Sequence, residues 1–269
     1  MKELKGQVFI VTGASSGIGE QIAIKLAQQG ATIILAARNM TRLNHLACEL
    51  RKNDKAEAVA MYLDLGQAEV IDGFVDSIIE QYGKIDGLIN SSGLGIFKPI
   101  QEIMYSDIYN QFSVNTLGTM YLSTKVAQEM VDQKSGHIVF IASIAGYLIT
   151  PSSSVYSASK SAIIMFANGL RLELAPYNIK VTTVNPGPVK TPFFSHTEAM
   201  KAYYRRVKLL AIKPENLAQD IVGNILNKGK KREMMRPRLL KLIPLLYYLA
   251  PSASDWFIRR FMNHKEEKK

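Results

Sequence analysis

The chain has 269 residues, of which 47% are hydrophobic, enough to fill the core of one large α/β domain or two small ones. Its net charge of +10 is concentrated in residues 228–269, which hold 12 Lys or Arg against 4 Asp or Glu, so the preceding body is close to neutral at +2. This uneven charge argues against a nucleic-acid-binding protein, the single cysteine excludes an internal disulfide, and no apolar run is long enough to span a bilayer.

The first two-thirds of the chain alternate between short β-rich runs and stretches with helical spacing. Gln7–Thr12 is a continuous apolar run, which predicts a strand covered on both faces. Ile18–Gln29 follows as an amphipathic helix that Gly30 is suited to end. The next predicted elements are the strand Thr32–Ala37, a helix around Met40–Arg51, and the strands Ala58–Leu63, Ile85–Asn90, His137–Ala142 and Lys180–Val184.

Strands that alternate with helices predict a parallel sheet with right-handed crossovers. We therefore expect an α/β protein with a three-layer, doubly wound Rossmann fold and a helical C-terminal extension. The weakest boundary lies near Gly229, so the chain divides into a Rossmann-type catalytic domain, residues 1–227, and a basic, apolar extension of the same domain, residues 228–269. Cys48, beside Leu46 and Ala47 in the second predicted helix, is expected to pack in the core.

A glycine cluster follows the first strand and opens the first helix. Glycines in this turn let the backbone approach a pyrophosphate, and the helix directs free N–H groups and its positive dipole end at the phosphates. This context predicts a dinucleotide site. The candidate cofactor-binding residues of the turn are Gly13, Ser15, Ser16, Gly17, Ile18 and Gly19.

The spacing Thr-Gly-x-x-x-Gly-x-Gly, with further motifs in the same order along Lys5 to Leu226, resembles the short-chain dehydrogenase/reductase family. Ser91 and Ser92 depart from that family's usual Asn-Asn-Ala-Gly. The motifs that carry the resemblance are Thr12–Gly19, Asp64-Leu65, Asn90-Ser91-Ser92-Gly93, Asn115, Ser143, Tyr156-Ser157-Ala158-Ser159-Lys160 and Pro186-Gly187-Pro188-Val189-Lys190-Thr191.

Tyr156 and Lys160 are four residues apart, which places them on one face of a helix, one turn apart. A nearby ammonium favours a phenolate, so we expect Lys160 to lower the pKa of Tyr156. The resemblance implies that Tyr156 donates the proton to a carbonyl oxygen, that Ser143 binds and polarises that oxygen, and that Lys160 also holds the nicotinamide ribose. It further implies that Asn115 anchors a water linking Lys160 to solvent.

The resemblance also assigns the remaining cofactor contacts. It gives Asp64 and Leu65 contacts to the adenine, and it places Asn90 and Gly93 along the cofactor cleft. It has backbone groups at Val189 and the Thr191 hydroxyl hold the nicotinamide carboxamide. Without the family, Asp64 is equally well a helix N-cap, and Asn115 a satisfied polar residue within a helix.

The end of the second strand predicts the choice between NADP(H) and NAD(H). An NAD enzyme usually carries an acidic residue there to bind the ribose 2′-OH, whereas this chain has Ala37 followed by Arg38. The planar guanidinium of Arg38 suits a 2′-phosphate, and Asn39 and Ser15 are supporting donors. The predicted cofactor is therefore NADP(H).

Residues after Thr191 are expected to form a lid, and their composition allows either an apolar substrate pocket or ordinary core packing. The lid residues are Phe193, Phe194, His196, Met200, Tyr203 and Tyr204. Further on, Arg236–Leu249 and Trp256–Met262 mix apolar and basic residues. These segments are expected to cover the pocket, to pack in a homo-oligomer (dimer or tetramer), or to contact a membrane surface peripherally.

The leading hypothesis is thus an NADPH-dependent oxidoreductase that interconverts a carbonyl and an alcohol, with a hydrophobic or lipid-like small molecule as substrate. The alternative is an NADP-binding redox sensor or regulatory protein, and a nucleic-acid binder ranks last. No metal site is expected, because the four histidines are scattered, and no Gly-x-Ser-x-Gly motif suggests a hydrolase. Without a predicted signal peptide, the expected location is cytoplasmic, with membrane association as an option.

Overall fold

The computed structural model describes residues 3–53, 56–195 and 197–261, and its centre is one parallel sheet in the order β3-β2-β1-β4-β5-β6-β7. All neighbouring strands pair in parallel. This arrangement confirms the doubly wound Rossmann fold. The strands are β1 Val8–Thr12, β2 Thr32–Ala37, β3 Ala58–Tyr62, β4 Gly87–Asn90, β5 Gly136–Ile141, β6 Ile179–Pro186 and β7 Glu233–Arg236.

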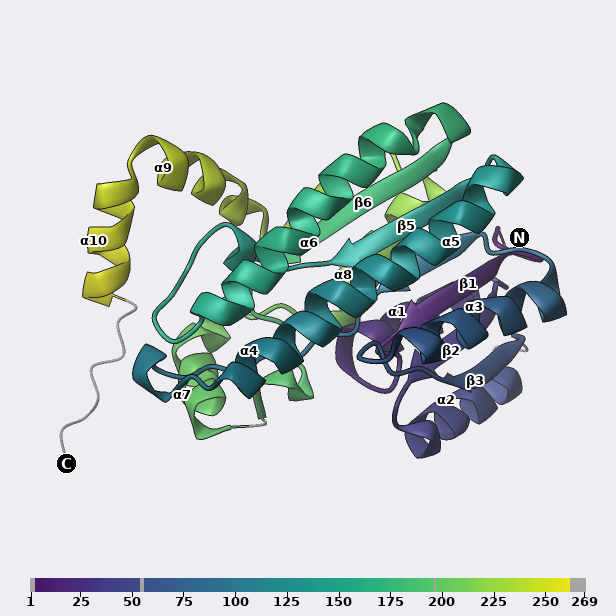
Figure 1. Cartoon of the computed structure of the whole chain (residues 1–269), viewed down its shortest axis with the longest axis horizontal. Coiled ribbons are helices and arrows are strands. Elements are labelled where there is room, and N and C mark those ends of the chain that lie inside the picture. The colour runs from purple at the N-terminus through teal and green to yellow at the C-terminus, as the bar shows by residue number, and fades with distance from the viewer. Residues whose placement is uncertain (1–2, 54–55, 196, 262–269) are drawn as a thin grey trace.

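Helices cover both faces of the sheet (Figure 1). One apolar core lies between the sheet and α1, α2 and α8, and a second lies between the sheet and α3, α5 and α6. The α-helices of the chain's described part are α1 Gly17–Gln28, α2 Met40–Asn53, α3 Ala68–Tyr82, α4 Tyr105–Phe112, α5 Thr119–Gln133, α6 Ser154–Glu173, α7 Glu198–Val207, α8 Pro214–Leu226, α9 Ile243–Leu249 and α10 Pro251–Phe261.

The strand sequences reflect this double coverage. Alternate residues of β1 enter different cores: Phe9 and Val11 pack on one face, and Val8 and Ile10 on the other. A strand that is buried on both sides has to be apolar at every position, which is why Gln7–Thr12 reads as an unbroken apolar run.

Cys48 does not pack in the core, so that prediction is wrong. It is exposed on α2, whereas its neighbours Leu46, Ala47 and Leu50 are buried. Successive residues of a helix are about 100° apart around its axis. The buried side of α2 is formed by Leu43, Leu46, Ala47 and Leu50, and Cys48, the residue after Ala47, falls outside that side.

The segment after residue 227 adds a strand that sequence analysis did not predict. β7 pairs with Thr183–Pro186 of β6 at the edge of the sheet, and Met234 and Met235 are buried there. After it, a 3₁₀ helix Arg238–Leu242, α9 and α10 form a helical arm at one end of the molecule (Figure 1). Among the described residues, no helix is long and apolar enough to cross a membrane.

His137 gives the fold a testable dependence on pH. It is buried at the start of β5, and its Nε2 lies 2.9 Å from Thr182 Oγ1. Burial, assisted by the nearby Lys180 charge, lowers the pKa of His137 from the ordinary 6.5 to about 4. As the pH falls, His137 is therefore protonated in the unfolded chain before it is protonated in the folded one. The free energy of unfolding decreases as the pH drops from 6.5 toward 4.

We expect about 3 kcal/mol of the free energy of unfolding to be lost at pH 4 through His137. Urea unfolding at neutral and acidic pH should show that His137→Gln removes this part of the acid sensitivity. His45→Gln is the matched control, because His45 lies on the exposed side of α2. Equal acid sensitivity in both variants would contradict the assignment.

Candidate active site

A cavity of about 1400 Å³ lies at the carboxyl edge of the sheet. Parallel strands bring their carboxyl ends to the same edge, where doubly wound folds bind ligands. The volume exceeds the range of about 300–1,000 Å³ typical of one small ligand, so the cavity can hold a dinucleotide and a second molecule together. Its wall includes a residue after each of five strands, namely Gly13, Arg38, Gly93, Ser143 and Val189.

The turn after β1 has the shape of a phosphate cradle. Gly13 has a φ of +65°, and a Cβ there would lie 2.9 Å from the Ser92 nitrogen. A Cβ on Gly19 would lie 2.5 Å from the Gly13 carbonyl oxygen, so glycine is required at both positions. The first turn of α1 leaves backbone N–H groups for an anion. These features fit the pyrophosphate of a dinucleotide.

The predicted residues of this turn take two positions. Gly13, Ser15, Ser16, Gly17 and Ile18 line the cavity. Gly19 is buried and does not line the cavity, and the absence of a Cβ lets α1 approach the turn closely.

Thr12, which begins the glycine motif but was not predicted as a site residue, braces the next loop. Its buried hydroxyl accepts hydrogen bonds from the backbone N–H groups of Ser91 and Ser92 at 3.0 and 3.1 Å. Because the bonds involve backbone amides, the loop after β4 is held although its side chains depart from the family pattern. The sequence feature that could have indicated this role is a hydroxyl residue at the end of an apolar strand, because a buried hydroxyl needs a hydrogen-bond partner.

Asn90 and Asn115 support the cavity from behind and are not part of its wall as the described residues form it. The Asn90 amide donates to Ser123 Oγ at 2.9 Å. Asn115 lies in a π-helical turn before α5, accepts from the Leu94 N–H at 2.7 Å, and donates to the Leu94 carbonyl at 2.8 Å and to Ser159 Oγ at 3.0 Å. It thereby ties the loop after Gly93 to α6.

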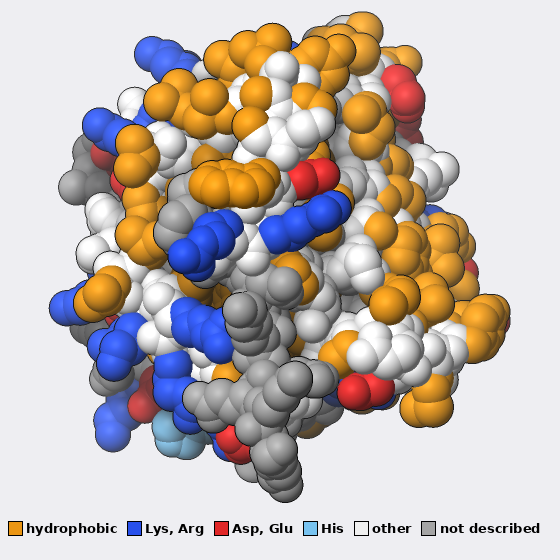
Figure 2. All heavy atoms as spheres, turned by 90° about the vertical axis from the view of Figure 1, so that its left-hand side faces the viewer, with side chains coloured by type: hydrophobic (Ala, Val, Ile, Leu, Met, Phe, Trp, Pro, Cys, Tyr) orange, Lys and Arg blue, Asp and Glu red, His pale blue; other side chains and the backbone are white. Residues whose placement is uncertain are grey.

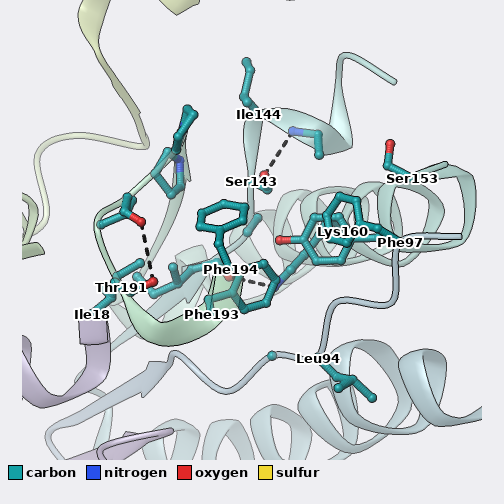
Figure 3. A pocket seen from close by; sticks show the side chains of 18 of the residues that line it. Ile18, Leu94, Phe97, Ser143, Ile144, Ser153, Lys160, Thr191, Phe193 and Phe194 are labelled. Atoms are coloured by element: carbon teal, nitrogen blue, oxygen red, sulfur yellow. Dashed lines mark hydrogen bonds between the residues drawn. The ribbon is translucent and has the colours of Figure 1, made fainter. Parts of the chain in front are cut away.

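Ser143, Tyr156 and Lys160 converge on the cavity, as Figure 3 shows for Ser143 and Lys160. Ser143 follows β5, and its Oγ accepts from the Ala145 N–H at 3.1 Å. Tyr156 and Lys160 come from one face of α6, and the Lys160 Nζ lies 5.9 Å from the centre of the Tyr156 ring. The Nζ donates to the carbonyl oxygen of Ile141, the last residue of β5, at 3.1 Å.

The pKa of Tyr156 shifts in the direction opposite to the expected one. Burial raises it, and the interaction with the Ser143 hydroxyl is a smaller effect that lowers it. Burial is the largest contribution, so the pKa of Tyr156 is raised despite the charged groups of the site. Burial lowers the pKa of Lys160 to about 8. Because the pKa of Tyr156 is raised, its phenol is protonated at neutral pH.

An aromatic wall covers the phenol. The Tyr156 ring lies 5.3 Å from the ring of Phe97 and 5.9 Å from that of Phe193, between centroids. Figure 3 shows Phe97, Phe193 and Phe194 gathered near Lys160 and Ser143. Phe97 was missed by sequence analysis, and its position shortly after the β4 motif was the only signal for it.

The predicted lid after Thr191 contributes to this wall. Phe193, Phe194 and Tyr203 line the cavity, and Met200 is buried beside Tyr156. Tyr204 packs on Phe194 with ring centroids 5.2 Å apart. His196 lies outside the described residues.

The remaining predicted cofactor residues all line the cavity: Arg38, Asn39, Asp64, Leu65, Gly93, Val189 and Thr191. Asp64 accepts from the Gly66 N–H at 3.0 Å and Asn39 from the Arg42 N–H at 3.1 Å, so both shape their turns. The Thr191 hydroxyl donates to the Val189 carbonyl at 3.5 Å.

The helical arm closes the far side of the cavity. Leu240, Ile243, Leu246 and Tyr247 reach it from the 3₁₀ helix and α9, and Ile258 reaches it from α10. Of the roles considered for this segment, covering the pocket is thus realised in the structure.

Comparisons with known proteins agree with this geometry. The family model for short chain dehydrogenase matches residues 7–202. An uncharacterized oxidoreductase of Staphylococcus saprophyticus is 39% identical over 198 residues, covering 74% of this chain and 85% of that protein. One from Staphylococcus epidermidis is 37% identical over 222 residues, 82% of this chain and 92% of that protein.

Solved structures share the architecture. An alcohol dehydrogenase from the archaeon Thermococcus sibiricus, complexed with 5-hydroxy-NADP, superposes with a TM-score of 0.76 at 26% identity, over 85% of this chain and 95% of that one. NAD⁺-bound xylitol dehydrogenase gives 0.77 at 28% identity, over 87% and 98%. A short-chain dehydrogenase from Sphingobium yanoikuyae with NADPH shares the fold over 98% of this chain and 99% of its own, with a TM-score of 0.77 at 23% identity.

The cradle after β1, the Ser143, Tyr156 and Lys160 cluster, and the match over residues 7–202 lead to one conclusion. The chain belongs to the short-chain dehydrogenase/reductase family and is an oxidoreductase that binds a nicotinamide dinucleotide and acts on an alcohol or carbonyl group.

Proposed function

We propose that this oxidoreductase uses NADPH to reduce the carbonyl group of a hydrophobic, lipid-like small molecule. The observation that carries the proposal is a single cavity with a phosphate cradle at one end and a buried, protonated tyrosine under an apolar wall at the other. An NADP-binding redox sensor has less support, because the Ser143, Tyr156 and Lys160 side chains all reach that cavity.

The residues around the end of β2 support NADP(H). Arg38 is exposed on the cavity wall, and the preceding position is Ala37, which has no carboxylate to repel a 2′-phosphate. Asn39 and Ser15 line the same part of the wall. The structural relatives carry either cofactor, so the argument rests on these side chains.

The proposed proton transfer follows from burial. The Tyr156 hydroxyl, protonated at neutral pH, donates to the carbonyl oxygen, which the Ser143 hydroxyl holds and polarises. When bound, the reduced nicotinamide supplies the hydride that the carbonyl carbon accepts. The Lys160 ammonium, fixed on the Ile141 carbonyl, stabilises the phenolate left behind and binds the ribose. Asn115 acts as a positioning residue through Leu94 and Ser159, on the route by which a water would reach Lys160.

The apolar wall supports a hydrophobic substrate. Phe97, Phe193 and Phe194 stand beside the phenol, and Leu246 and Ile258 close the far side of the cavity. Burial of an apolar substrate against such side chains contributes about 25 cal/mol per Å² of buried area. The proposed partner is therefore a small carbonyl or alcohol compound with a long or bulky apolar part.

We also propose a cytoplasmic homo-oligomer, a dimer or tetramer, with no nucleic acid as partner. Apolar side chains are exposed on neighbouring faces of α4 and α5, including Tyr105 and Tyr109 on α4 and Leu117 just before α5. A patch of this kind is typical of a protein–protein contact. The single, exposed Cys48 thiol suits a reducing compartment.

Removing the Tyr156 hydroxyl should abolish turnover. We expect Tyr156→Phe to lower kcat/KM for NADPH oxidation with a panel of apolar ketones and aldehydes by about 10²–10⁴-fold, because the proton donor is lost. NADPH affinity, measured by fluorescence titration, should change by less than about threefold. Tyr203→Phe, in the same aromatic wall, is the control and should retain most activity. Full turnover in Tyr156→Phe would exclude this residue as the donor.

Changing the charge at the end of β2 should change the cofactor. We expect Arg38→Asp to shift the ratio of kcat/KM for NADPH to that for NADH by about 10–100-fold toward NADH, since a charge-assisted hydrogen bond is replaced by repulsion. Lys52→Asp makes the same charge change near the far end of α2 and should leave the ratio as it was. An unchanged ratio in Arg38→Asp would refute the NADP(H) assignment.

The reduction should slow in alkaline solution. Because burial lowers the pKa of Lys160 to about 8, the ammonium loses its proton above that pH, and the charge that stabilises the phenolate disappears. We expect kcat/KM for carbonyl reduction to be constant near neutral pH and to fall above about pH 8. A rate that rises through this range would contradict the role given to Lys160.

A further inference from the structure

The helical arm exposes far more apolar surface than covering a pocket requires. We call the outer surface of the 3₁₀ helix Arg238–Leu242, α9 and α10 the C-terminal face. Leu239 is 79% exposed, Tyr248 85%, Leu249 69% and Trp256 65%. Monomeric soluble proteins rarely leave large side chains of this kind together on one surface, so the face has to be matched by an apolar environment.

α9 is apolar on both sides. Its sequence, Ile-Pro-Leu-Leu-Tyr-Tyr-Leu, contains no charged residue. Ile243 and Tyr247 point to the cavity and are half-buried, whereas Leu245, Tyr248 and Leu249 are exposed. A helix that only roofed the cavity needs one apolar side, with polar residues on the other. The second apolar side requires its own explanation.

Basic side chains accompany these apolar ones. From residue 238 to residue 261 the basic residues are Arg238, Lys241, Arg259 and Arg260, against one acidic residue, Asp255. Asp255 accepts a hydrogen bond from the Tyr247 hydroxyl at 3.3 Å. Figure 2 views this end of the molecule and shows hydrophobic side chains next to Lys and Arg side chains. The combination of apolar and cationic groups matches the interface of an anionic bilayer.

The same helices line the cavity, which connects the two observations. Leu246 belongs to the cavity wall and is still 58% exposed, and Leu210, on the 3₁₀ helix Lys208–Leu210, lines the cavity and is 57% exposed. Leu246 thus belongs both to the wall of the cavity and to the C-terminal face, so the two surfaces meet at this residue. A docked arm would therefore bring the cavity wall next to the apolar environment that covers the face.

We propose that the C-terminal face docks on the surface of an anionic membrane, and that the enzyme takes a membrane-dissolved carbonyl compound directly from the bilayer. The second half of this inference rests on the proposed carbonyl reductase function. With 7 residues, α9 is about 10 Å long, so it lies in the interface and does not span the membrane.

Charge favours a bilayer over a second copy of the chain. A two-fold contact through this face would bring the same four basic residues of two copies together around an apolar centre, with one acidic residue from each. Like charges placed opposite each other oppose association. Anionic headgroups have the opposite sign and neutralise the same residues.

Vesicle sedimentation with the full chain tests the docking. The wild type should cosediment with phosphatidylcholine vesicles that contain phosphatidylglycerol, and much less with phosphatidylcholine alone or in high salt. Leu245→Asp with Leu249→Asp should weaken the partition coefficient by about tenfold or more. Lys241→Glu with Arg259→Glu should weaken it by about 30-fold or more, since each basic residue contributes about a factor of five.

Leu172→Asp with Tyr177→Asp is the matched control, because both side chains are exposed near the C-terminal end of α6. This variant should bind vesicles like the wild type. Wild-type protein that stays in the supernatant, or leucine variants that bind as well as the control, would overturn the proposal. So would leucine variants that dissociate an oligomer in lipid-free sedimentation while vesicle binding persists, since a second copy would then cover the face.

NADPH oxidation with a short, water-soluble aldehyde separates this inference from the proposed function. None of the four substituted residues of the C-terminal face lines the cavity, so both double variants should keep that activity within about twofold. Wild-type protein that reduces the aldehyde but does not bind vesicles would refute the membrane docking and leave the proposed function intact. Wild-type protein that binds vesicles but reduces no carbonyl compound would refute the proposed function and leave the membrane docking intact.

Discussion

The hydrogen bond from the Lys160 ammonium to the Ile141 carbonyl fixes the arrangement of the whole site. It joins the second turn of α6 to the last residue of β5 at 3.1 Å, and Lys160 is buried. A buried ammonium without an acceptor is costly, so the bond holds α6 at one distance from the sheet edge. Tyr156 lies one helical turn before Lys160, and Ser143 lies two residues after Ile141. The bond between Lys160 and Ile141 therefore also holds Tyr156 and Ser143 at the same cavity.

Burial then determines the chemistry. Phe97 and Phe193 pack on the Tyr156 ring, and burial raises the pKa of Tyr156, so the phenol keeps its proton until an acceptor arrives. The same aromatic groups make the substrate end of the cavity apolar. In the proposed function, the proton donor and the preference for apolar substrates therefore have one physical cause, which is the burial of Tyr156 among aromatic side chains.

Sequence patterns predicted the parts of the molecule that depend on local order. The unbroken apolar strands and the glycine turn identified the sheet and the phosphate cradle, and the spacing of Tyr156 and Lys160 placed both on one face of α6. β7 was missed because Glu-Met-Met-Arg becomes a strand only against the edge of β6. Phe97 and α9 reach the cavity through tertiary packing, and the periodicity of apolar residues in the sequence does not predict such contacts. The direction of the Tyr156 pKa shift was wrong because the sequence shows which charge is near and not how deeply the phenol is buried.

The most direct test of this account is the protonation state of the Tyr156 phenol, followed by NMR in protein carrying tyrosine labelled with ¹³C at the Cζ position. Comparison with Tyr156→Phe identifies the resonance. Since burial dominates, the resonance should remain that of a neutral phenol through neutral pH and beyond the range in which exposed tyrosines ionise near pH 10. A phenolate resonance at neutral pH would show that Lys160 outweighs burial, and would contradict the claim that burial keeps the Tyr156 phenol protonated.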